Sequence, residues 1–292
     1  MKVAVVTDTH SGITKTEADE LGIYLINAPF MVNGKQHYEG VDLNHDSFYT
    51  LLEDGADVST SQSSPAELLS LWDKLLEEHD ELVIIPLSSG LSGGYQTMAA
   101  LACDDKYEDR VFVVDNLGVS VTERRAAINA KRLSEKGYSG ADIKRLLEEH
   151  RKDNLIYITV PTLKYLKKGG RITPAAAALG TLLKIKPVLC IDGDKLDAFS
   201  KARTMSKAEE IMLDAAASAL SDRLKDDAGE ESFIYVVHSQ NNEAARLLSD
   251  KVKAKWPKAT VETAELALAI ACHTGPGALA VAVERKLREA VS

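Results

Sequence analysis

Short runs of β-branched apolar residues, each stopped by polar or glycine-rich residues, recur in the first half of this chain. They lie at residues 3–6, 82–87 and 111–114. Runs of this length and composition are typical of strands that are buried on both faces of a parallel sheet. Helical patterns separate them, at 65–77 behind the N-cap residue Ser64, at 97–103 and at 121–136. Because crossovers between parallel strands are right-handed, this order predicts an α/β fold, beginning with an α/β/α domain on a parallel sheet.

The second half of the chain has a different pattern. Strands are expected at 155–160, 185–191, 195–200, 233–238 and 260–265, with a turn at 192–194, and amphipathic helices at 207–224 and 242–255. This mixture predicts a C-terminal α/β domain that has a mixed sheet with helices on one face. We therefore predict two domains, residues 1–155 and residues 156–292.

The composition limits the class of protein. The 292 residues are 45% apolar and 27% charged, which is ordinary globular usage, and they suffice for a large core. The net charge of -9 argues against a general nucleic-acid binder, because a phosphate backbone favours a basic face. Cys103, Cys190 and Cys272 are an odd number with no Cys-x-x-Cys spacing, so neither a disulfide framework nor a zinc site is indicated.

Targeting signals are not evident. The apolar run at 3–6 is too short for a signal-peptide core, and no uncharged apolar run approaches the roughly 18 residues that a membrane span needs. The sequence therefore predicts a cytoplasmic protein that does not span a membrane.

Three polar, glycine-rich loops stand out. They are Thr-Ser-Gln-Ser-Ser-Pro at 60–65, Ser-Ser-Gly-Leu-Ser-Gly-Gly-Tyr-Gln at 88–96, and His-Thr-Gly-Pro-Gly-Ala at 273–278. The first two supply small hydroxyl donors where a strand would lead into a helix. In the third, Gly275 and Gly277 allow close backbone approach, and a helix beginning at Ala278 would direct its N-terminal amides to the same place. The three loops could converge on one small anionic or carbonyl group.

The second loop also fits a catalytic motif. Gly90-Leu91-Ser92-Gly93-Gly94 matches the nucleophile elbow Gly-x-Ser-x-Gly, and Ser92, Asp115 and His273 follow the chain order of an α/β-hydrolase triad. Against this, Asp115 ends the very next strand, and no His-Gly-Gly oxyanion loop is present. A serine hydrolase therefore stays an alternative to ligand binding by the Ser92 hydroxyl at a helix N-terminus.

A metal-dependent phosphoesterase is a further alternative. The segments Asp8-Thr9-His10 and Asn44-His45-Asp46 resemble its signatures. Asp42 and the second segment are too close in sequence to end two successive strands, which argues against the usual two-metal site.

Basic and small residues form two more features of the second half. Lys167-Lys168-Gly169-Gly170-Arg171 places three positive charges on a predicted turn, and Arg171, like Arg203, could pair with a carboxylate or phosphate. The helix at 175–183 is lined with alanine. It could leave a narrow apolar slot, in which each buried methylene contributes about 0.8 kcal/mol.

These loops, together with Val6-Thr7-Asp8, the Lys-Lys-Gly-Gly-Arg segment and Leu-Leu-Lys-Ile-Lys-Pro at 182–187, resemble the DegV family of bacterial fatty-acid-binding proteins nearly end to end. The resemblance implies a two-domain DegV-like fold with a long-chain fatty acid bound between the domains. It also implies the binding subunit of a fatty acid kinase (FakB-like), which presents the carboxylate to a separate catalytic subunit that makes an acyl phosphate.

The same resemblance implies the site residues. Those that match the family's ligand-binding positions are Thr60, Ser61, Ser92, Gly93, His273, Thr274, Arg171 and Arg203. Thr60, Ser92 and His273 would donate to the carboxylate, and the two arginines would lie near the mouth. No cofactor or metal is implied beyond the fatty acid. The chain has no Gly-x-x-x-x-Gly-Lys-Ser/Thr loop, so it would be a carrier and not an enzyme. The family usually has Asp-Ser-Thr where this chain has Asp8-Thr9-His10, which leaves the role of His10 open.

Overall fold

The computed structural model describes residues 2–179, 185–193 and 195–291. The chain divides into two compact units, Met1–Arg151 with Leu287–Ser292, and Lys152–Lys286. The C-terminal segment thus belongs with the first unit, although the sequence placed it in the second domain. The reason is its apolar side chains, because Leu287 and Ala290 are part of the first unit's core.

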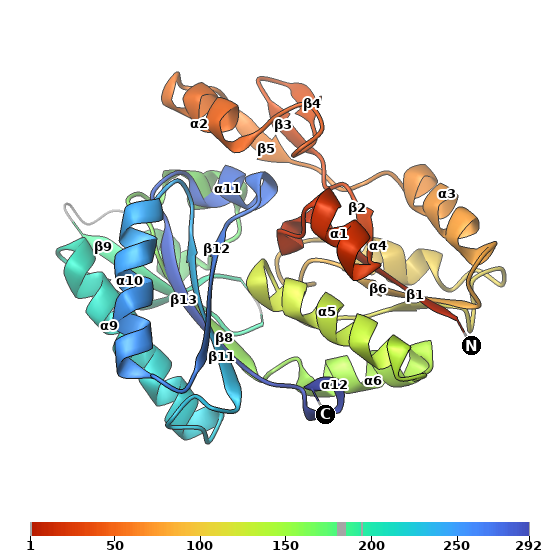
Figure 1. Cartoon of the computed structure of the whole chain (residues 1–292). Helices are drawn as coiled ribbons and strands as arrows, with labels where there is room; N and C mark the ends of the chain where they lie inside the picture. The colour runs from red at the N-terminus through yellow and green to blue at the C-terminus, as the bar shows by residue number, and fades with distance from the viewer. Residues whose placement is uncertain (1, 180–184, 194, 292) are drawn as a thin grey trace. The chain divides into compact units, whose positions relative to one another are not determined.

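A four-stranded parallel sheet organises the first unit (Figure 1). Its order is β2-β1-β6-β7, with β1 at Val3–Asp8, β2 at Tyr24–Ile26, β6 at Glu81–Ile85 and β7 at Val111–Val113. The helices are α1 Lys15–Leu21, α3 Pro65–Leu76, α4 Gly94–Leu101, α5 Val121–Glu135, α6 Gly140–His150 and α12 Arg288–Val291. This confirms the predicted parallel N-terminal sheet.

Alternate residues of the strands face opposite helix layers, as the two-residue period of a strand requires. Val5 and Val83 pack in one core with the α5 residues Ala127 and Ala130. Val6 lies in the other core, with Leu68 and Trp72 of α3 among its members. Helix α3 begins as predicted, because the Ser64 side chain accepts from the backbone N–H of Glu67 and Pro65 occupies the first turn.

The sequence did not indicate a small antiparallel sheet in residues 30–60. It has the order β4-β3-β5, with β3 at Phe30–Val32, β4 at Lys35–His37, β5 at Val58–Thr60 and α2 at His45–Glu53. Phe30, Phe48 and Tyr49 form its buried aromatic contacts. Strands of three residues are too short for an alternating pattern to be recognised.

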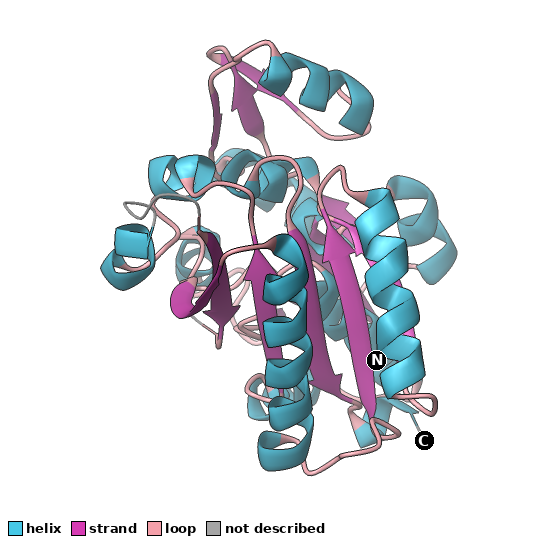
Figure 2. Cartoon of the chain, turned by 90° about the vertical axis from the view of Figure 1, so that its left-hand side faces the viewer, coloured by secondary structure: helices cyan, strands magenta, loops and turns pink. Residues whose placement is uncertain are grey.

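A mixed sheet organises the second unit, as predicted, and it has six strands where the sequence indicated five. The order is β10-β9-β8-β13-β11-β12, with β8 Asn154–Thr159, β9 Lys186–Ile191, β10 Asp197–Ala202, β11 Ser232–His238, β12 Thr260–Glu265 and β13 Leu279–Arg285. β11 and β12 pair in parallel, and the pairs β10–β9, β9–β8, β8–β13 and β13–β11 are antiparallel. Helices α9 Met205–Ser218 and α10 Asn242–Lys255 cover one face (Figure 2), and α9 continues as a π-helical turn over Ala219–Arg223.

Three shorter helices complete this unit: α7 Lys164–Gly169, α8 Pro174–Leu179 and α11 Leu268–Thr274. The predicted turn at 167–171 is wrong, because Lys167 and Lys168 belong to α7, which ends at Gly170 in a left-handed conformation. The helix expected from Ala278 is also wrong. Residues 279–285 form β13, whose alternating small residues are buried between β8 and β11.

Parts of three sequence features lie outside the described residues. These are 180–183 of the alanine-lined helix, 182–184 of the 182–187 motif, and Asp194 of the predicted turn. Within the described part of the chain, no helix combines the length and the apolar character that crossing a lipid bilayer requires.

Candidate functional site

The strand order of the first unit defines a topological switch point. From β1 the chain moves to β2 on one side, and from β6 it moves to β7 on the other side. The loops that follow β1 and β6 therefore diverge at the carboxyl edge of the sheet. In open α/β sheets, this is where ligands bind.

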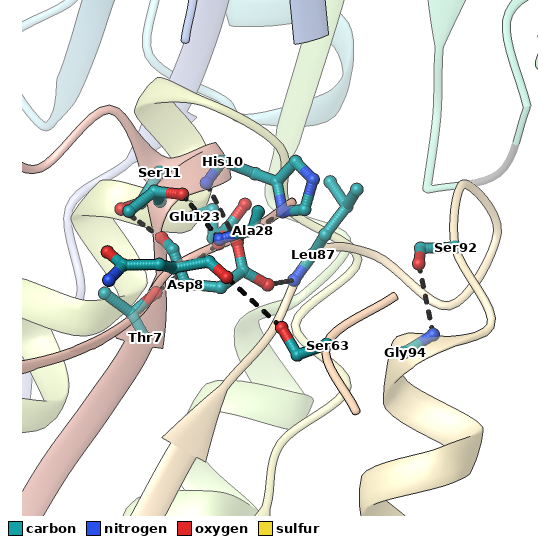
Figure 3. A network of polar contacts seen from close by, with 12 residues as sticks. Thr7, Asp8, His10, Ser11, Ala28, Ser63, Leu87, Ser92, Gly94 and Glu123 are labelled. Atoms are coloured by element: carbon teal, nitrogen blue, oxygen red, sulfur yellow. Dashed lines mark hydrogen bonds and ion pairs between the residues drawn. The ribbon is translucent and has the colours of Figure 1, made fainter. Parts of the chain in front are cut away.

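Asp8, the last residue of β1, is the centre of a buried polar network at this edge (Figure 3). Its carboxylate accepts from the backbone N–H groups of Leu87 at 3.0 Å and His10 at 2.9 Å, and lies 2.5 Å from His10 Nδ1. Burial alone would raise the pKa of Asp8, but His10 and the hydrogen bonds hold that pKa below its ordinary value. Asp8 is therefore ionised although it is buried.

Glu123, in the first turn of α5, lies beneath Asp8 and is fully buried. Burial, and then the charge of Asp8, raise the pKa of Glu123 well above its ordinary value. Thr7 is also near, because its hydroxyl donates to the carbonyl of Ile85 at 2.7 Å and lies 3.4 Å from Glu123 Oε1. The two acids are therefore coupled, and their opposite pKa shifts favour a proton on Glu123 and a negative charge on Asp8.

The loops at 60–65 and 88–96 are joined to each other by Gln62. Its Oε1 accepts from the Thr97 hydroxyl at 2.9 Å. A Cβ at Gly93 would lie 2.5 Å from Gln62 Nε2, so a side chain at position 93 would displace the Gln62 amide. Two predicted site segments are thereby brought together.

The same loops are joined to the end of β1. Ser63 Oγ donates to the carbonyl of Asn27 at 3.3 Å, and the N–H of Ala28 donates to Thr9 Oγ1 at 2.9 Å. With the Leu87–Asp8 bond, these contacts close a ring of segments at the carboxyl edge, which we call the edge ring. It consists of residues 8–10, 27–28, 62–63 and 87–97.

Ser92 is the predicted site residue whose hydroxyl is best placed to bind a ligand. Its Oγ accepts from the N–H of Gly94 at 3.1 Å, and its N–H donates to the carbonyl of Ser88. In the described part of the chain, the hydroxyl hydrogen has no acceptor. Thr60 and Ser61 belong to the adjoining segment, where Thr60 ends β5 and pairs with Phe30.

The contacts of Ser92 do not favour a nucleophile. Ser92 is not among the described non-glycine residues with positive φ, whereas a nucleophile elbow is a strained turn. Asp115 accepts from the Ser89 hydroxyl at 2.8 Å and so orients a different residue. In the first unit, Ser92 Oγ therefore accepts one hydrogen bond and keeps its hydroxyl hydrogen for a ligand, and it lacks the contacts of an activated serine.

The residues of the phosphoesterase alternative have structural contacts. Asp8 is saturated by N–H donors, Asn44 caps α2 through Ser47, and His45 Nε2 lies 2.8 Å from Glu39. Over residues 2–179, 185–193 and 195–291, no group of three or more His, Cys, Asp or Glu side chains is arranged to hold a metal ion.

In the second unit, the His-Thr-Gly-Pro-Gly turn begins with the last two residues of α11 and is fastened by Ser239. Ser239 Oγ donates to the carbonyl of Gly275 at 2.6 Å and accepts from the N–H of Ala278 at 2.9 Å. Gly275 has φ of 70°, and a Cβ there would overlap the ring of Tyr165. Thr274 is buried. The turn therefore holds His273 in one place on the end of α11.

His273 and Arg171 meet at Gly169. The His273 ring lies where a Cβ of Gly169 would be, and Arg171 Nη1 donates to the Gly169 carbonyl at 2.5 Å. Arg203 lies just beyond β10 and is exposed. In this unit the structure thus brings His273 and Arg171 together at Gly169, and it places Arg203 just after the end of β10.

The Asp8–His10–Glu123 network was missed at the sequence level. A signal was present, because Glu123, Ala126, Ala127 and Ala130 share the i, i+3, i+4 and i+7 spacing of one helix face. A glutamate on an otherwise apolar stripe predicts a buried acid. Such an acid needs a partner at the end of a neighbouring strand.

Comparison with known proteins supplies the family context. A family model described as "Uncharacterised protein, DegV family" matches residues 2–286. A DegV domain-containing protein of Clostridium acetobutylicum is 31% identical over 99% of this chain and 100% of its own length.

Two solved structures are similar over nearly the whole chain. A DegV family protein from Thermus thermophilus, described by its fatty acid binding, is 30% identical with a TM-score of 0.87, over 98% of this chain and 100% of that one. DegV of Bacillus subtilis, described as a fatty acid binding protein, is 30% identical with a TM-score of 0.85 over the same shares.

Proposed function

This chain belongs to the DegV family, and from that premise we propose that it binds a long-chain fatty acid. The observation that carries the proposal is the Ser92 hydroxyl, whose hydrogen has no acceptor among the described residues and which stands at a topological switch point. A carboxylate accepts hydrogen bonds from such donors, and hydrogen bonds to charged groups are the stronger ones. The fatty acid binding described for two relatives supports the same ligand class.

The proposed carboxylate contacts are Thr60, Ser61, Ser92, Gly93, His273 and Thr274. Ser92 donates through its hydroxyl, and Thr60 and Ser61 lie on the segment that Gln62 joins to the Ser92 loop. His273 donates from the turn that Ser239 fastens. The acyl chain packs against apolar side chains, where each buried methylene contributes about 0.8 kcal/mol.

We further propose that the chain is a cytoplasmic carrier and not an enzyme. In this role, it presents the carboxylate to a separate fatty acid kinase for acyl-phosphate formation. Lys167, Lys168, Arg171 and Arg203 supply positive charge on an otherwise acidic chain. Such a local reversal of charge suits an acidic partner surface, because complementary charges speed association.

The binding proposal is tested by native mass spectrometry of the purified protein, followed by denaturing extraction and identification of released lipid. One fatty acid per chain is the expected result. A protein that stays empty after incubation with fatty acids of several chain lengths would overturn the proposal.

The partner proposal is tested by kinase turnover with the loaded protein. Arg203→Ala is the cleaner variant, because Arg171 also holds the Gly169 carbonyl against which His273 lies. We expect Arg203→Ala to keep its fatty acid and to lower turnover. Arg246→Ala, which removes an exposed charge paired with Asp250 on α10, is the matched control. Equal turnover in both variants would remove Arg203 from the partner surface.

A further inference from the structure

His10 belongs to the edge ring, and among the described residues its imidazole has a partner at one nitrogen, Nδ1. Nδ1 lies 2.5 Å from Asp8, and the side chain is 14% exposed. Nε2, at the opposite corner of the ring, has no hydrogen-bond partner within 2–179, 185–193 and 195–291. In Figure 3 the ring extends away from Asp8 over Leu87. Nε2 is therefore available to a ligand.

Asp8 fixes which nitrogen is available. A carboxylate beside Nδ1 keeps the proton on Nδ1, so the neutral ring offers a lone pair at Nε2. The same carboxylate orients the ring, as the acid orients the histidine in a serine-hydrolase triad. Asp8 is itself held in place by the N–H of Leu87 at 3.0 Å.

The other ionisable groups on the neighbouring elements leave Asp8 as the negative charge beside His10. Glu123 on α5 faces Asp8, and burial raises the pKa of Glu123, which favours its neutral form beside Asp8. Arg124, the next residue along α5, forms an ion pair with Glu17 at 2.9 Å. Asp115, on the loop after β7, accepts a hydrogen bond from the Ser89 hydroxyl. The ionised Asp8 is thus the charge in direct contact with His10.

A carboxyl group that enters a dry protein site favours its neutral form, because burial penalises the charge. The neutral form is a weaker hydrogen-bond acceptor for donors such as the Ser92 hydroxyl, and it is a poorer nucleophile toward a phosphoryl group. A carrier that delivers a carboxylate therefore benefits from a base beside the head group.

We propose that His10, aligned by Asp8, accepts the proton of the ligand's carboxyl group at Nε2. In this step R–COOH and neutral imidazole give R–COO⁻ and imidazolium, the Nδ1 proton stays with the Asp8 pair, and no other reactant is needed. His10 then contacts the ligand directly, and Asp8 is a positioning residue. The inference rests on the proposed function, since it requires a fatty acid whose head lies at the edge ring.

The test uses the full chain loaded with [1-¹³C]oleic acid. The ¹³C chemical shift of the carboxyl carbon is followed by NMR as the pH is lowered, in wild type and in His10→Gln. We expect the bound carboxyl group of His10→Gln to protonate at a pH higher by about 1 unit, because a facing positive charge is lost. Asp8→Asn is the second variant, and a ¹⁵N spectrum should show that His10 has lost its Nδ1–H preference.

Three outcomes are separable. The expected shift in His10→Gln, with no shift in the control His79→Gln, supports the inference. His79 is a suitable control because it lies at the opposite edge of the sheet. Its neighbour Asp80 donates its N–H to the Lys2 carbonyl, just before β1. Identical titrations in wild type and His10→Gln would overturn it while leaving the carrier function intact. A wild-type protein with no bound oleate signal would overturn the carrier function itself, and this inference with it.

Discussion

The imidazole of His273 lies against the backbone of Gly169, so closely that a methyl group at position 169 would occupy the same space as the ring. Arg171 holds that peptide from the same loop, through a 2.5 Å bond from Nη1 to the Gly169 carbonyl. The absence of a side chain at Gly169 is therefore what lets α7 and the end of α11 approach each other. Any change at this glycine acts first on His273.

Gly169→Ala should weaken fatty acid binding with little loss of stability. The added methyl displaces the His273 ring, and losing its hydrogen bond to a carboxylate would weaken binding by about tenfold. Alanine is the better helix residue by up to about 1 kcal/mol, which offsets part of the strain. Fluorescent fatty acid displacement and urea unfolding measure the two effects separately.

Gly170→Ala is the matched control for that prediction. Gly170 has φ of 68°, and no atom of the residues that the structure describes lies within 4 Å of an added Cβ. Its substitution should cost about 1 kcal/mol of unfolding free energy through the left-handed backbone, and leave the affinity unchanged. Weaker binding in Gly170→Ala than in Gly169→Ala would contradict the role given to the His273 contact.

Ser92→Ala should lower the affinity for fatty acid by about ten- to a hundredfold, since a hydrogen bond to a charged group contributes about 1.5–3 kcal/mol. Ser89→Ala, in the same loop, serves as the control because its hydroxyl donates to Asp115. Isothermal titration with a soluble medium-chain acid gives both affinities. An unchanged affinity in Ser92→Ala would remove Ser92 from the head-group site.

Glu123→Gln should change how stability depends on pH. The pKa of Glu123 is well above 4.5 in the folded protein. In the unfolded chain the group ionises near its ordinary pKa, so its contribution is complete below that value. It is lost as pH rises toward the folded pKa, by about 1.4 kcal/mol per pH unit. Glutamine keeps an N–H donor for Asp8 and does not ionise.

The stability of Glu123→Gln relative to wild type should therefore improve as pH rises from the ordinary carboxyl pKa of about 4.5 toward the raised folded pKa, measured by urea unfolding. Glu135→Gln on the same helix is the control, because Glu135 is exposed and pairs with Lys131 at the surface. A constant difference between Glu123→Gln and wild type over this range would mean that Glu123 is ionised when folded.

Sequence patterns predicted the long elements well, for physical reasons. The buried runs at β1, β6 and β8 have few alternatives to a strand, and α10 matches its predicted range of 242–255 because its apolar spacing is regular. β13 was mistaken for a helix because alternating alanine and valine suit either structure. Only its place between β8 and β11 decides between them.

The sequence predicted which loops form the candidate site, but it did not predict which residues of these loops contact each other. Small polar residues at 60–65 and 88–96 indicated a binding edge, but nothing in their order indicates that Gln62 reaches Gly93 and Thr97. The Asp8–His10 pair also depends on tertiary structure. Leu87 and Glu123 are distant in sequence and reach Asp8 only because β6 and α5 pack beside β1.

Gln62→Ala should weaken fatty acid binding by about fivefold, while the unfolding free energy changes little. The reason is that Gln62 joins the Thr60 segment to the Ser92 loop through Thr97 at 2.9 Å, and an exposed hydrogen bond of this kind contributes about 1 kcal/mol. Without it, the two sets of donors are ordered only when the ligand binds, and that ordering opposes binding. Gln96→Ala is the control, since its amide meets only the Ser89 carbonyl at 3.5 Å. If both variants bind as tightly as wild type, the two loops do not need Gln62 to act as one site.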